Sequence, residues 1–135
     1  MKFNILRLNL ASPLFYIPDK GIDPFNCPED GERLFCFELD EAQYSNFEPD
    51  KEKLLGSLIF SGKTGEGEEA FLELPSGNYI FAQEKRLLSR EEIIDMAVEI
   101  QLETLWQRFR PGGKLFLRYL YEDGNWVTQL FRPYL

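Results

Sequence analysis

The segment 61–64, Ser-Gly-Lys-Thr, carries the residue types of a nucleotide-binding loop. A phosphate-binding loop needs a glycine, four further residues, Gly-Lys-Ser/Thr, and then a helix whose N–H groups hold the phosphates. The first glycine would fall at position 57, which is Ser57, and residues 65–69 read Gly-Glu-Gly-Glu-Glu. Because these residues are glycine-rich and acidic where a helix and phosphate would lie, we interpret the segment as a hairpin loop between strands 53–61 and 69–74.

Histidine is absent from the chain, which excludes Ser-His-Asp and Cys-His catalysis within it and every zinc site that needs imidazole. Cys27 and Cys36 lie nine positions apart and make no metal motif, so we interpret both as small core residues. A calcium loop starting at Asn26 fails, since Pro28 cannot ligate and Phe37 stands where a bidentate glutamate is required. No cofactor or metal is predicted.

Paired carboxylates are the remaining catalytic candidates, at Glu38 with Asp40 and at Glu48, Asp50 and Glu52. General acid–base catalysis needs at least one carboxyl group whose pKa is displaced by burial or by a like charge. Neither condition can be seen in the sequence, and exposed carboxylates are the common case. A carboxylate-based hydrolase or isomerase is therefore the weakest of three alternatives, and nothing in the sequence points to an enzyme.

The composition indicates a single domain spanning residues 1–135, because 44% of the residues are hydrophobic and 15% are aromatic. No apolar run approaches the roughly 20 residues that a membrane-spanning helix needs. The first ten residues alternate between polar and apolar types, which favours a strand over a signal peptide. Two cysteines make no disulfide framework, so we expect a cytoplasmic protein.

The net charge of −8 is concentrated between positions 19 and 52, where eleven acidic residues face three basic ones. Such a segment repels a phosphate backbone, so we do not expect direct nucleic-acid binding. It is suited either to solvation or to a basic protein partner. The candidate interaction residues are Asp23, Glu29, Asp30 and Glu32, in or beside a Pro- and Gly-rich loop at 18–32.

Five stretches read as strands: 2–10, 14–17, 33–39, 53–62 and 68–83. The last of these is interrupted by Leu-Pro-Ser-Gly-Asn-Tyr at 74–79. Pro75 presets φ for a turn and Gly77 supplies a positive φ, so we predict a hairpin there.

One long helix is predicted over about 89–109. Ser89 and Glu92 form a capping box, and Leu88 with Ile93 has the spacing of a hydrophobic staple. Pro111-Gly112-Gly113 is expected to end the helix. The broad apolar face is predicted to contain Ile93, Ile94, Ala97, Val98, Ile100, Leu102, Leu105, Trp106 and Phe109. An acidic stripe of Glu92, Asp95, Glu99 and Glu103 is predicted opposite it.

A C-terminal hairpin is predicted around Asp123-Gly124, the strongest short-range turn signal in the chain. Its register places Tyr121 opposite Trp126 and Arg118 opposite Gln129. Both faces carry apolar residues, whereas one helix covers only one face. The resulting fold class is α+β, a mainly antiparallel sheet with the long helix on one face and a C-terminal hairpin.

Aromatic residues supply the candidate ligand site. Trp106 lies on the helix, and Tyr119, Tyr121 and Trp126 lie on the hairpin. Aromatic side chains with a polar tip suit apolar ligands and protein interfaces, and they also fill ordinary cores. Arg118, on the other face of the hairpin, could bind a carboxylate ligand or extend to solvent.

The sequence at 74–79, followed by a capped helix and a hairpin, resembles one β-α-β-β half of the GyrI-like ligand-binding family. That resemblance covers about 60 residues and implies a small-molecule binder. The family has two such halves, and residues 1–68 show no second capped helix, so no functional residue is carried over.

The leading hypothesis is a non-catalytic protein-interaction module. It acts either as a homodimer through the uncovered hairpin face or with a basic protein partner through the acidic segment 19–52. The alternative is a small-molecule-binding protein, whose pocket between helix and sheet is lined by Trp106, Tyr119 and Trp126. No membrane association is expected.

Overall fold

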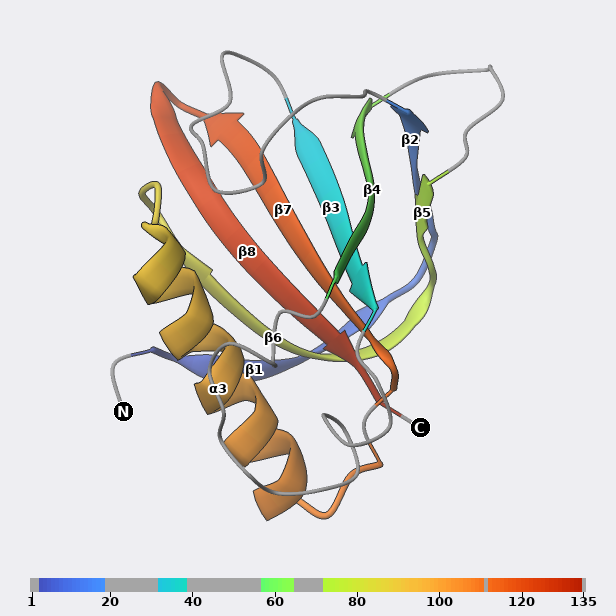
Figure 1. The fold of residues 1–135 in the computed structure, drawn as a ribbon, viewed down its shortest axis with the longest axis vertical. Coiled ribbons are helices and arrows are strands. Elements are labelled where there is room, and N and C mark those ends of the chain that lie inside the picture. Colours follow the sequence, from blue (N-terminus) through green and yellow to red (C-terminus); the bar gives the residue numbers. More distant parts are fainter. Residues whose placement is uncertain (1–2, 19–31, 39–56, 65–71, 111, 135) are drawn as a thin grey trace.

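The computed structural model describes residues 3–18, 32–38, 57–64, 72–110 and 112–134. They form one helix and eight strands, in an antiparallel sheet that the helix crosses on one face (Figure 1). The elements are β1 (Ile5–Leu10), β2 (Leu14–Pro18), β3 (Arg33–Glu38), β4 (Ser57–Thr64), β5 (Leu72–Leu74), β6 (Gly77–Glu84), α3 (Arg90–Trp106), β7 (Lys114–Glu122) and β8 (Asn125–Pro133). The α+β class predicted from the sequence is confirmed.

The strand order is β1-β6-β8-β7-β3-β4-β2-β5, and the sheet curls back on itself. β1 and β2 are successive parts of one extended segment, and so are β5 and β6. β1 pairs with β6 and β2 pairs with β5, while β6 also pairs with β8 and β2 also pairs with β4. The two extended segments bend sharply between their parts (Figure 1), and together they close the sheet around its concave face.

Two hairpins predicted from the sequence are wrong. β5 and β6 do not pair with each other, because Pro75 and Ser76 bend a continuous strand instead of reversing it. Gly77 does take a positive φ of 140°, as the turn chemistry requires. β4 and β5 are separated by β2, and β4 extends to Thr64, so Ser61–Thr64 belongs to a strand and not to a loop. Turn residues fix a change of direction but not which strand lies beside the chain afterwards.

The C-terminal hairpin has the predicted register, including Tyr121 opposite Trp126 and Arg118 opposite Gln129. Asp123 and Gly124 have φ values of 51° and 81°. Positive φ at both central residues is the geometry of a type I′ turn, whose twist matches that of the two strands.

The amino-terminal end of α3 also follows the sequence. Ser89 is the N-cap, its Oγ accepts from the Glu92 N–H at 3.2 Å, and Glu92 Oε1 accepts from the Ser89 N–H at 3.2 Å. Both bonds satisfy N–H groups that have no partner inside the helix.

The carboxyl end of α3 lies earlier than predicted, at Trp106 instead of near Phe109. Arg108 adopts a positive φ of 60°, its N–H donates to Leu105 O, and the Phe109 N–H donates to Thr104 O, both at 3.0 Å. This pair of bonds is a Schellman motif, which usually has glycine in the left-handed position. The helix therefore stops before Pro111-Gly112-Gly113 is reached.

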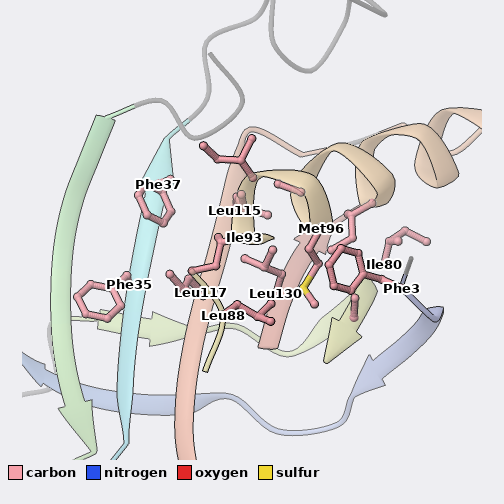
Figure 2. Packing of buried hydrophobic residues seen from close by; sticks show 14 of the residues in the cluster. Phe3, Phe35, Phe37, Ile80, Leu88, Ile93, Met96, Leu115, Leu117 and Leu130 are labelled. Carbon is pink, nitrogen blue, oxygen red and sulfur yellow. The ribbon is translucent and has the colours of Figure 1, made fainter. Parts of the chain in front are cut away.

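Alternation along the strands divides the buried side chains into two cores. The convex core lies between α3 and the sheet, where side chains such as Ile93 and Met96 point toward Leu117 and Leu130 (Figure 2). The concave core is enclosed by the curled sheet and contains Tyr16, Leu34, Cys36, Leu74, Tyr79, Phe81, Phe116 and Phe131. The second apolar face of the hairpin is thus buried by strands of the same chain.

The described part of the chain contains no helix long and apolar enough to cross a membrane.

Candidate functional site

The structure separates Trp106 from the other three aromatic residues of the predicted ligand site, which lie on the hairpin. Tyr119 is buried in the convex core, where its ring meets that of Phe35 edge-on at 6.0 Å. The ring centroids of Tyr121 and Trp126 lie 5.1 Å apart beside the β7–β8 turn. Trp106 is 83% exposed at the carboxyl end of α3, the end that lies away from that turn (Figure 1).

The contact between α3 and the sheet is tightly packed in the described residues. Ile93, Met96 and Ile100 have no exposed surface, and Ile80, Leu117 and Leu130 have none on the sheet side. Packed interiors leave few voids larger than a water molecule. The candidate sites therefore lie on the surface of α3 and on the concave face of the sheet.

The outward face of α3 combines acidic and apolar side chains. At 100° per residue, Leu102 and Trp106 lie on the same side of the helix as Asp95 and Glu99. Leu102 is 36% exposed and lies one helical turn before Trp106. The two exposed apolar side chains are therefore neighbours. We use "outward face of α3" for Glu91, Glu92, Asp95, Glu99, Leu102, Glu103 and Trp106.

This arrangement corrects the predicted apolar face, which included Leu102 and Trp106. Their helical phase places them with the acidic stripe and away from Ile93 and Ile100, which are buried. An exposed tryptophan next to an exposed leucine therefore needs an explanation other than core packing.

A second polar arrangement lies on the concave face, built around Arg118 of β7. Its Nε donates to Tyr16 Oη at 2.8 Å, its Nη1 to Gln129 Oε1 at 3.2 Å, and its Nη2 to Glu32 Oε2 at 3.0 Å. Gln129 Nε2 donates in turn to Gln83 Oε1 at 2.9 Å. We call Tyr16, Glu32, Gln83, Arg118 and Gln129 the Arg118 network.

Curvature of the sheet brings this network together. Gln83, Gln129 and Arg118 are neighbours through strand pairing, whereas Tyr16 of β2 reaches Arg118 across the concave face, past β3 and β4. The Tyr16 hydroxyl also donates to Glu32 Oε2 at 3.0 Å. One carboxylate oxygen of Glu32 thus accepts from both the tyrosine and the arginine.

Burial dominates the electrostatics of the concave face. It raises the pKa of the Tyr16 hydroxyl well above its usual value; the Arg118 charge opposes the rise, and the Glu32 charge and hydrogen bond add to it. Burial likewise raises the pKa of Tyr79 to about 12, with a further contribution from Glu73. The Tyr79 hydroxyl donates to the Pro75 carbonyl at the strand bend. Both phenols are therefore neutral hydrogen-bond donors at neutral pH.

The predicted acidic interaction residues are only partly covered by the structure. Asp23, Glu29 and Asp30 lie outside the described residues, as does Cys27. Glu32 is described, and its carboxylate pairs with Arg118 of the same chain, with a third of the side chain exposed. Cys36 is buried in the concave core, as expected for a small core residue.

The chain matches no protein-family model, and no curated protein matches it. The resemblance to one GyrI-like half, which covers about 60 residues and rests mainly on residues 74–79, therefore stays a prediction.

Sequence reasoning found only part of the Arg118 network. The hairpin register pairs Arg118 with Gln129, and this could be predicted from the Asp-Gly turn. Glu32 and Tyr16 lie 86 and 102 positions from Arg118, and no local pattern connects them. Their approach depends on closure of the sheet, which only the tertiary structure supplies.

Proposed function

We propose that this protein is a non-catalytic interaction domain that binds a protein partner through the outward face of α3. The observation that carries the proposal is Trp106, which is 83% exposed with Leu102 beside it. Full burial of a tryptophan removes about 150–250 Å² from water, which corresponds to roughly 4–6 kcal/mol at about 25 cal/mol/Å². Tryptophan is accordingly among the residues that most often dominate binding energy at protein interfaces.

Charge on the same face favours a basic partner. Five acidic side chains lie along the outward face of α3, and the whole chain has a net charge of −8. Opposite charges accelerate association and fix orientation, while a central apolar contact supplies affinity. The partner surface that fits is an apolar patch or groove bordered by lysine or arginine side chains.

A homodimer is expected only if one apolar face of the C-terminal hairpin is left uncovered. Residues of its second face, including Phe116 and Phe131, are buried within the chain. We therefore place the interaction on α3 and assign it to a different protein.

A peptide titration tests the proposal. The probe is a labelled amphipathic helix of leucine and lysine, and its anisotropy is followed as protein is added. We expect saturable binding that weakens with added salt, and Trp106→Ser weakens it at least tenfold, or about 1.4 kcal/mol. Tyr121→Ser is the matched control, because Tyr121 is also an exposed aromatic residue but lies on the hairpin.

Reversing one charge tests whether the acidic side chains of the outward face of α3 contribute to binding. Glu103→Lys is expected to reduce affinity and flatten the salt dependence, whereas Glu122→Lys, an exposed acid on the β7–β8 hairpin, leaves both nearly unchanged. Equal affinity of the wild-type protein and Trp106→Ser, or no binding at all, would overturn the proposal.

A further inference from the structure

We propose that Arg118 and Tyr16 form a carboxylate-binding site on the concave face, which the Glu32 side chain occupies in this structure. The site is separate from the outward face of α3, since α3 packs on the convex side of the sheet. Its ligand class is a monocarboxylate, from either a small acid or a polypeptide.

The donors of the site converge on one carboxylate oxygen. Arg118 Nη2 and Tyr16 Oη each lie 3.0 Å from Glu32 Oε2. Hydrogen bonds between a charged donor and a carboxylate are among the strongest in proteins, and arginine presents its donors in a fixed plane. The pair therefore recognises a carboxylate by geometry as well as by charge.

Neighbouring side chains hold the donors in place without the carboxylate. Arg118 Nε donates to Tyr16 Oη, and Arg118 Nη1 donates to Gln129 Oε1. Gln129 is fixed by Gln83 on the next strand. Because each contact comes from a different strand, removal of Glu32 leaves the arrangement of the other four side chains intact.

The site is open to exchange with solvent. The Arg118 side chain is 16% exposed and that of Glu32 is 33% exposed, so an external carboxylate can replace Glu32 without opening the sheet. Glu32 is the more exposed partner of this ion pair, so its carboxylate is the group that an external carboxylate displaces. Arg118 carries the one positive charge among the five side chains of the Arg118 network, and a single positive charge suits a monocarboxylate.

The test removes the internal carboxylate and supplies an external one. In Glu32→Ala, the NMR signal of the Arg118 Nε–H group is followed while acetate replaces chloride at constant ionic strength. We expect a saturable shift at millimolar acetate, the range suited to one small set of charge-assisted bonds. The wild-type protein should need roughly 3–10 times more acetate, because Glu32 competes for the site.

Two further variants in the Glu32→Ala background show which groups bind. Tyr16→Phe keeps the buried ring and removes the hydroxyl, and we expect it to weaken acetate binding severalfold. Arg86→Met is the matched control, since Arg86 is an exposed arginine outside the network, and it leaves binding unchanged. The absence of a saturable shift in Glu32→Ala, or equal binding after Tyr16→Phe, would overturn the inference.

A short peptide with a free carboxyl end, compared with its amidated form, distinguishes the two sources of the carboxylate. Tighter binding of the free peptide than of acetate indicates a polypeptide ligand, and equal binding indicates a small acid. Failure of the acetate test would leave the Trp106 proposal untouched, because the two use different faces and different readouts.

Discussion

Glu92 illustrates how one residue couples the helix start to pH. The Arg86 guanidinium, which donates to Glu92 Oε2 at 2.6 Å, and then the Ser89 N–H lower the pKa of this carboxyl group to about 2. A lowered pKa in the folded state means that the interaction stabilises fully above the ordinary value of 4.5 and is lost as the pH falls from there toward about 2.

The lowered pKa of Glu92 predicts how Glu92→Gln changes stability with pH. Denaturant unfolding should find the variant less stable than the wild-type protein at neutral pH, and the difference should shrink as the pH falls through about 4.5 toward about 2. Glu91→Gln serves as the control, because Glu91 lies in the same turn and takes no part in the capping box. A difference that is independent of pH would contradict the assignment.

Arg108 is the second residue whose position makes a prediction. It holds a left-handed conformation in the Schellman motif, where a side chain with a Cβ atom costs about 1 kcal/mol. Arg108→Gly should therefore raise the free energy of unfolding by about 0.5–1 kcal/mol, measured by denaturant unfolding. Arg110→Gly, two positions on and outside the motif, should not stabilise; equal effects of the two changes would argue against the strained conformation.

At the scale of the element, α3 has a buried side and an outward side whose residues should respond differently to truncation. Ile100 is fully buried against the sheet, and Leu102, two positions later, is 36% exposed. Ile100→Ala should destabilise the protein by about 2–5 kcal/mol, since it removes buried apolar atoms and leaves a cavity. Leu102→Ala should cost less than about 1 kcal/mol by the same denaturant measurement. Similar losses for both variants would mean that the helix phase is wrong.

The elements also show what sequence reasoning can and cannot reach. The capping box at Ser89 and the hairpin at Asp123-Gly124 depend on residues close together in the sequence, and the structure confirms both predictions. The turn chemistry at Pro75 was recognised but assigned to a hairpin, because a bend and a reversal use the same residues. The carboxyl end of α3 was placed too late, since arginine gives no signal for a left-handed position.

At the scale of the whole molecule, closure of the sheet explains why both faces of the C-terminal hairpin are apolar. A hairpin with two apolar faces predicted a cover from elsewhere, and closure of the sheet provides it, since Tyr16 of β2 and Leu74 of β5 share the concave core with Phe116 and Phe131. The same closure brings Tyr16 and Glu32 to Arg118, so the candidate carboxylate site could not be found from the sequence. With both hairpin faces buried, the exposed apolar residues at the end of α3 become the strongest candidate for contact with a partner.

Photocross-linking in cells of the organism that makes the protein tests the central claim most directly. A photoreactive phenylalanine derivative is placed at position 106, on the outward face of α3, and separately at position 121, an exposed site on the hairpin. We predict a discrete cross-linked product from position 106 that is reduced when Glu103 is changed to lysine, and none from position 121. Products from position 121 and none from position 106 would contradict the assignment of the interaction to α3.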